Sequence, residues 1–179
     1  MFRGLRKSIG IQQARFHFRK SRERVISFTT SFSAAHNALL ILPLQHRDFP
    51  ATLTVINMLK QQFHEENMTV VVTEGDKEAR KRLAHSRFIP LNLSEITYFY
   101  LPRKEVLDSV RRKRYDLAID LNLDLVLPSA YICKASDAPV RIGFVRKRAE
   151  KFFNFQIQVD HTQERQVIYD RLAKCLQMF

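Results

Sequence analysis

From residue 38 onward, short apolar runs alternate with segments whose apolar residues recur every three or four positions. Runs of this length are typical of strands that are buried on both faces of a sheet. A further segment from Phe153 to Val159 alternates apolar and polar residues, which predicts a strand with one wet face near a sheet edge. The apolar runs that predict the other strands cover residues 38–42, 68–73, 88–91, 115–121 and 140–144.

Helical periodicity fills the segments between these runs. Pro50 and Pro102 each suit the first turn of a helix, and shorter helices are expected at residues 77–84 and 128–134. Asp160 is expected to cap the last helix. Strands that alternate with helices in this way predict an α/β fold, a Rossmann-like and mainly parallel sheet with helices on both faces.

Residues 1–37 have a different composition, and we expect them to form a basic N-terminal arm ahead of a domain at residues 38–179. Glu23 is their single acidic residue, while Phe2, Leu5 and Ile9 fall on one face of a helix. Such an arm suits docking on a charged partner or a membrane surface. It also has the makeup of an organelle transit peptide, and the remaining alternative is a solvated, partly disordered tail.

The net charge of +12 predicts attraction to an anionic partner such as an acidic protein surface, anionic lipid or nucleic acid. Besides the arm, residues 80–82, 111–114 and 146–148 are basic clusters, and each of them alone is also compatible with a solvated surface. The candidate partner-binding residues are Arg3, Arg6, Lys7, Arg15, Arg19, Lys20, Arg22, Arg24, Arg111, Arg112, Lys113, Arg114, Arg146, Lys147 and Arg148.

The sequence lacks the motif residues that several classes of cofactor and metal site require. The four glycines are too scattered for a dinucleotide fingerprint or a P-loop, so we expect no cofactor. Asp120 begins a spacing typical of a calcium loop, but Leu125 and Tyr131 stand where the loop needs Gly and Glu. The two cysteines lie in no metal motif, so no metal is expected. No apolar run approaches the ~20 residues of a transmembrane segment, and we expect a cytoplasmic protein, with peripheral attachment to the membrane as an option.

Three strings in this order resemble the N-terminal domain of glycosyltransferase family 9, which contains the ADP-heptose–lipopolysaccharide heptosyltransferases. The first is the strand at residues 39–42 with the loop through Asp48, and the second is the Tyr-Asp-Leu-Ala-Ile-Asp-Leu string at residues 115–121. The third is Arg-Ile-Gly-Phe at residues 141–144. The resemblance covers residues 38–179 and implies one half of a two-domain GT-B fold, without the half that holds the sugar nucleotide.

The resemblance also implies a role for Asp48, which matches the loop aspartate that acts in the family as general base on the acceptor hydroxyl. Arg47 stands where the family has Gly, so the backbone lacks the freedom of glycine and a positive charge lies beside the carboxylate. Asp48 is therefore a catalytic candidate only if the chain is an enzyme. The other interpretation is that Asp48 ends the strand and starts the helix.

Three functions remain open from the sequence. The first is a non-catalytic accessory subunit that docks through its basic surfaces on protein subunits of a larger acidic or membrane-associated complex, for example a reaction centre. The second is a heptosyltransferase-like enzyme whose donor domain is separate or missing. The third is a protein that binds RNA or the ribosome.

Overall fold

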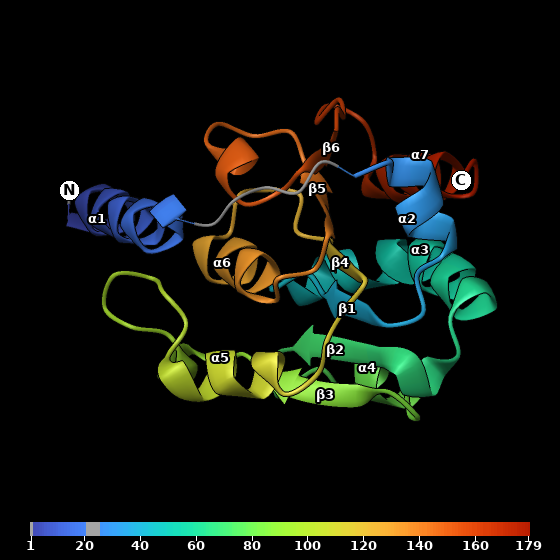
Figure 1. Cartoon of the computed structure of the whole chain (residues 1–179), viewed down its shortest axis with the longest axis horizontal. Coiled ribbons are helices and arrows are strands. Elements are labelled where there is room, and N and C mark those ends of the chain that lie inside the picture. Colours follow the sequence, from blue (N-terminus) through green and yellow to red (C-terminus); the bar gives the residue numbers. More distant parts are fainter. Residues whose placement is uncertain (1, 21–25) are drawn as a thin grey trace.

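The computed structural model describes residues 2–20 and 26–179, and these residues form a six-stranded sheet with helices on both faces (Figure 1). Every neighbouring pair of strands is parallel, in the order β3-β2-β1-β4-β5-β6. The Rossmann-like fold class predicted from the sequence is confirmed. The strands are β1 (Ala38–Ile41), β2 (Met68–Val72), β3 (Arg87–Pro90), β4 (Leu117–Asp120), β5 (Val140–Phe144) and β6 (Phe155–Ile157).

The helices between the strands follow the order that the periodicity predicts, but α5 begins at Lys104, so Pro102 lies before the helix and not in its first turn. Pro50 lies in the first turn of α3, as expected for a residue without a backbone N–H. The helices are α1 (Phe2–His17), α2 (Phe28–Ser33), α3 (Phe49–Gln62), α4 (Lys77–Arg82), α5 (Lys104–Arg111), α6 (Leu127–Ala135) and α7 (Arg165–Leu176). Among the described residues, no helix combines the length and the apolar composition needed to cross a membrane.

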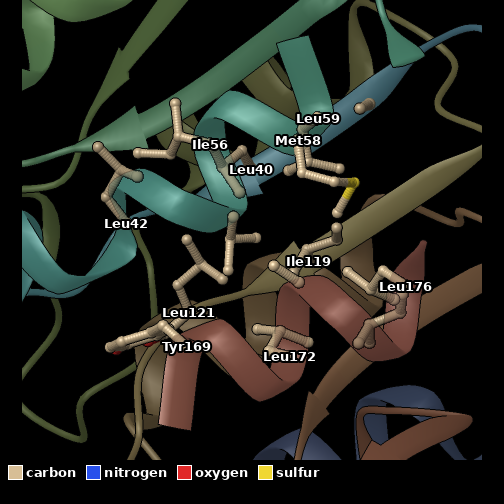
Figure 2. Close-up of a cluster of buried hydrophobic side chains, with 14 of the residues drawn as sticks. Leu40, Leu42, Ile56, Met58, Leu59, Ile119, Leu121, Tyr169, Leu172 and Leu176 are labelled. Carbon is tan, nitrogen blue, oxygen red and sulfur yellow. The ribbon is translucent and has the colours of Figure 1, made fainter. Parts of the chain in front are cut away.

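Alternation along the strands creates two hydrophobic cores. Leu40 and Leu42 point to one face of the sheet, where α3 and α7 cover them together with Ile119 of β4 (Figure 2). The neighbouring residues Leu39 and Ile41 belong to the core on the opposite face, which α5 and α6 cover. A strand flanked by helices on both sides must be apolar on both sides, which explains the continuous runs in the sequence.

Helix α1 packs beside α6 at one end of the molecule (Figure 1). Its residues Ile11 and Ala14 are buried in the same core as Leu39 and Ile41. Most of the segment predicted as an arm is thus helical where it is described, although the expected boundary between residues 37 and 38 stays a prediction. Arg22 and Arg24 lie outside the described residues.

The last helix begins later than the sequence predicts. Asp160 accepts hydrogen bonds from the backbone N–H and the hydroxyl of Thr162, at 2.9 and 2.7 Å, and so closes a local turn. Helix α7 starts at Arg165, after Glu164. The prediction of Asp160 as the helix cap was wrong because its carboxylate satisfies this turn instead.

Candidate functional site

The order of the strands reverses direction between β1 and β4, because the chain moves from β1 to β2 and β3 on one side and then returns to β4 on the other. In open parallel sheets, ligands bind outside the carboxyl ends of the strands at such a switch point. A cleft of about 280 Å³ opens at this position, between the loops that follow β1 and β4 and the segment that leads into α7. Its polar lining residues include Arg47, Asp48, Asn122, His161, Gln163 and Arg165.

Asn122 forms hydrogen bonds to the segments that follow both central strands, β1 and β4, at the base of the cleft. Its side-chain oxygen accepts a hydrogen bond from the backbone N–H of Leu44 at 3.0 Å, and its amide nitrogen donates to Asp120 Oδ1 at 2.7 Å and to the carbonyl of Leu42 at 3.4 Å. The loops after β1 and β4 therefore meet through a single buried side chain. This arrangement fixes the floor of the cleft.

Asp120 lies at the end of β4 and is fully enclosed by this network. Burial raises its pKa to about 6, although hydrogen bonds from the amide side chain and backbone N–H of Asn122 and from Ser129 oppose the shift. A carboxyl group titrating near neutral pH is common in active sites, but it also occurs in structural networks. Because Asn122 and not Asp120 lines the cleft, the bonds of Asp120 are directed to the protein interior.

Asp48 also lines the cleft, and only 9% of its side chain is exposed. Its Oδ1 lies 2.5 Å from Nε of Arg165 and 3.8 Å from Nε of Arg47. Although these contacts are ion pairs, Oδ1 makes no hydrogen bond of suitable geometry within the described part of the chain. Two guanidinium groups thus lie beside the carboxylate that the sequence presents as a candidate base.

Beside the cleft, the loop after β5 contacts both the loop after β4 and the segment after β6. The guanidinium of Arg146 donates a hydrogen bond from Nη2 to Nδ1 of His161 at 2.7 Å, because a guanidinium has only donors. Its Nε lies 3.8 Å from Asp124. Burial lowers the pKa of Arg146, while the nearby carboxylate of Asp124 opposes this shift. Arg146 therefore has partners on both sides and serves as a structural bridge at the rim.

Arg165, His161 and Gln163 had no role in the sequence prediction of the site. Gln163 carries a buried Oε1 that makes no hydrogen bond with a described atom. No local motif marks these residues, because they reach the cleft only after β6 has returned the chain to the sheet. Within residues 2–20 and 26–179, no three His, Cys, Asp or Glu side chains are grouped as a metal site would require.

Cys133 is not a candidate for nucleophilic chemistry. Cys133 is buried in α6, and its burial raises the pKa of the thiol well above the ordinary value. The thiolate is the reactive form, so this side chain is a small apolar residue of the core. Cys175 is half-buried on α7.

Several of the predicted partner-binding residues make contacts inside the protein. Arg6 stacks over Tyr98, with 3.6 Å between the guanidinium carbon and the ring centre, and donates to the carbonyl of the same residue. Lys7 donates to the carbonyl of Leu125 at 3.0 Å, and Lys113 donates to that of Asn67 at 3.3 Å. These side chains stabilise loops, which reduces their availability to a partner.

Two of the three basic clusters lie at opposite ends of the strands, and the third, Arg80–Arg82, lies on α4. Arg111–Arg114 precede β4, and Lys113 contacts Asn67 immediately before β2, so this cluster lies at the amino ends of the strands. Arg146–Arg148 follow β5 and lie at the carboxyl ends, where they share a cleft of about 340 Å³ with Lys7 of α1. The length of the strands, roughly 15 Å, separates the two clusters.

The exposed residues among the predicted partner-binding residues lie at both ends of the strands and on α1. They are Lys7, Arg15, Arg19, Arg111, Arg112, Arg114, Lys147 and Arg148. The side chains of Arg3 and Lys20 are not among those that the structure describes. The binding roles of all these residues stay predictions.

Comparison with known proteins identifies the family. The sequence profile of the family of unknown function DUF6913 matches residues 16–179. The chain belongs to this family. No curated protein matches the sequence significantly.

Solved structures similar to this DUF6913 protein are glycosyltransferases. The Escherichia coli heptosyltransferase WaaC with ADP superposes with a TM-score of 0.60 and 19% identity, over 78% of this chain and 46% of that chain. The E. coli ADP-heptose lps heptosyltransferase II gives 0.59 and 21%, over 76% and 40%. A glycosyl transferase family 9 structure from Veillonella parvula gives 0.61 and 15%, over 80% and 42%.

The resemblance to glycosyltransferase family 9 is thus confirmed at the level of the fold. The chain spans less than half the length of these structures, as expected for one half of a two-domain fold. Identities of 15–21% carry the architecture but not the activity.

Proposed function

We propose that this DUF6913 protein is a non-catalytic accessory subunit, a glycosyltransferase-like half-domain that docks through basic surfaces on a larger acidic or membrane-associated complex. The observation that carries this proposal is the state of Asp48. This residue occupies the position of the candidate base, yet it is buried and paired with Arg47 and Arg165.

A general base must come within hydrogen-bond distance of the proton that it removes, about 3 Å between heavy atoms. An acceptor hydroxyl would have to displace the guanidinium of Arg165 from Oδ1 of Asp48, and only 9% of this side chain is open to solvent. The ion pair instead gives Asp48 a structural role, because it joins the loop after β1 to the first turn of α7.

The docking part of the proposal is supported by the uncompensated basic groups. Three exposed arginines lie at the amino ends of the strands, namely Arg111, Arg112 and Arg114. Within the described ranges, none of them forms an ion pair with an acidic residue. Such charges steer association with acidic surfaces and favour encounter at low salt. A partner with acidic side chains would complement the charge of this cluster.

A second candidate function is sugar transfer with a donor domain on another chain. The cleft at the switch point favours it, since this is where a ligand binds in related sheets, and the similar structures are named as heptosyltransferases. In this case Asp48 would be released from Arg165 when the acceptor binds. Binding to RNA, the remaining candidate, is less well supported because the basic clusters do not form one continuous track across the sheet.

The experiment that tests the proposal is purification of the tagged full chain from its native cells in mild detergent, followed by mass spectrometry and a sugar-transfer assay of the eluate. We expect a stoichiometric complex and no transfer activity. A triple variant with Arg111, Arg112 and Arg114 changed to Gln should lose the complex. A variant with Lys77, Arg171 and Lys174 changed to Gln removes the same charge from exposed positions outside the basic clusters and should retain the complex.

The substitution Asp48→Asn separates the two functions. The accessory-subunit proposal expects this variant to keep its partners. If the eluate transfers sugar and Asp48→Asn abolishes that activity, the chain is an enzyme and the proposal is wrong. If nothing copurifies with the wild-type chain, the docking role is wrong.

A further inference from the structure

Helix α1 has one face that is firmly attached to the rest of the protein. Gly10 lies so close to the loop before α5 that an added Cβ would come within 2.0 Å of the carbonyl oxygen of Phe99. Ile11 and Ala14 are buried beside it, and Lys7 holds the same face through its bond to Leu125. The orientation of α1 about its own axis is therefore fixed.

The opposite face of α1 is apolar and open to solvent. Leu5 is 61% exposed and Phe16 is 73% exposed. They are eleven positions apart, which is about three helical turns, so they point in the same direction. Between them on this face lie Ile9, which is half-buried, and the exposed Gln12. Because Gly10 and Ala14 project to the other side, Leu5 and Phe16 point away from the body of the protein.

Positive charge borders the apolar row. Arg15 and Arg19 are exposed, and the guanidinium of Arg19 lies 5.1 Å from the ring centre of Phe16. Residues 1–20 contain no acidic side chain. A row of Leu, Ile and Phe between basic residues is typical of helices that lie in the plane of a membrane interface, where apolar groups enter the acyl region and cations meet the headgroups.

A second aromatic residue lies beside the helix. Tyr98 is 63% exposed, and Arg6 on the flank of α1 holds it through the stacking contact and the bond to its carbonyl. Tyr is enriched at membrane interfaces because its ring is apolar and its hydroxyl is polar. The loop and the helix therefore present compatible groups to the same kind of surface.

We propose that the outer face of α1, formed by Leu5, Ile9 and Phe16 with their basic neighbours, binds an anionic lipid bilayer. This inference rests on the proposed docking function and names lipid as one of its partners. Lipid is favoured over an acidic protein because the exposed apolar side chains match the acyl region of a membrane surface, and the basic side chains beside them match its anionic headgroups. Binding is expected to be reversible, since few apolar side chains enter the bilayer.

The test uses the purified full chain and vesicle flotation. We expect binding to vesicles of equimolar phosphatidylcholine and phosphatidylglycerol, and little binding to phosphatidylcholine alone. Leu5→Gln combined with Phe16→Gln should weaken binding by about tenfold or more, and higher salt should weaken it as well. Met178→Gln is the matched control, because Met178 is 78% exposed near the C-terminus, at the other end of the molecule in Figure 1.

The inference is wrong if the wild-type chain does not float with anionic vesicles, or if the double variant floats equally well. It is also wrong if the wild-type chain is a dimer in solution and the double variant is a monomer, since the face would then bind a second copy. Circular dichroism and thermal melting show whether the variant is folded. If the chain copurifies with a protein complex but does not bind vesicles, the proposed function still holds and only this inference is wrong.

Discussion

The carboxylate of Asp48 contacts the guanidinium of Arg165, and this pair ties the loop after β1 to the beginning of α7 across the switch point of the sheet. The same contact occupies the group that the sequence presents as a candidate base. Stability and activity measurements on the pair therefore address the central question about this protein.

For the Asp48–Arg165 pair, we expect Arg165→Gln to lower the free energy of unfolding by about 1–3 kcal/mol, because a mostly buried carboxylate loses its main partner. Arg165 is 44% exposed, so the loss should fall below that of a fully buried pair. Urea unfolding measures it. The double variant with Asp48→Asn should be more stable than the sum of the single effects predicts, and strict additivity would show that the two side chains do not interact.

Gly10 and Gly4 offer a matched test of the attachment of α1. Gly10→Ala should displace the helix, because the added methyl group would meet the backbone of Phe99, and amide hydrogen exchange in α1 should then accelerate. At Gly4 no atom lies within 4 Å of an added Cβ, so Gly4→Ala should stabilise the helix by up to about 1 kcal/mol. Equal exchange rates in both variants would argue against the packing of α1.

The raised pKa of Asp120 predicts a pH-dependent stability. The folded protein holds the proton up to about pH 6, whereas the unfolded chain releases it near the ordinary value of 3.8. Between these values the folded state binds more protons, so stability should fall as pH rises, by an amount on the order of 3 kcal/mol. Above about pH 6 this contribution should be constant.

Urea unfolding across this pH range, with Asp120→Asn as the variant, measures the effect of Asp120. The variant should lack the decrease, because its side chain does not titrate. Asp108→Asn removes the same charge from an exposed position on α5 and serves as control. A wild-type profile that matches the Asp120→Asn profile would contradict the assignment.

Tyr169 anchors α7 to the sheet through its hydroxyl, which donates to the carbonyl of Leu121 at 2.6 Å. The hydroxyl is buried, and its burial raises the pKa of Tyr169 strongly. Tyr169→Phe should destabilise the protein by about 1–3 kcal/mol, because the carbonyl of Leu121 is left without this partner. Thermal or urea unfolding measures the change. Tyr98→Phe, at an exposed position, should be close to neutral, and similar losses in both would indicate a general effect of the substitution.

The sequence predicted the parallel sheet well because the signal is local. Residues 38–42 are apolar throughout, and only a strand covered on both faces requires this. The edge position of β6 was predicted from an equally local signal, the alternation of apolar and polar residues after Phe153. The sequence failed at Asp160, where a helix cap and a local turn use the same residue type, and the choice depends on how the chain leaves β6.

The candidate site was predictable only in part. The resemblance to glycosyltransferase family 9 pointed to Asp48, and the order of the strands places the residues after β1 and β4 at one edge. The bond between Leu44 and Asn122, which are 78 positions apart, leaves no mark in either local sequence. The same is true of Arg165, which becomes part of the cleft because α7 packs against α3.

By itself, the sequence determined the order of strands and helices, the positive charge, and an amphipathic pattern near the N-terminus. These properties depend on the periodicity and composition of short segments. The tertiary structure decided that Asp48 is held by Arg165 and that Arg111–Arg114 and Arg146–Arg148 lie at opposite ends of the strands. It also decided that Leu5 and Phe16 face solvent while Gly10 faces the protein. Each of these outcomes depends on which distant segments pack together, and short-range patterns do not contain that information.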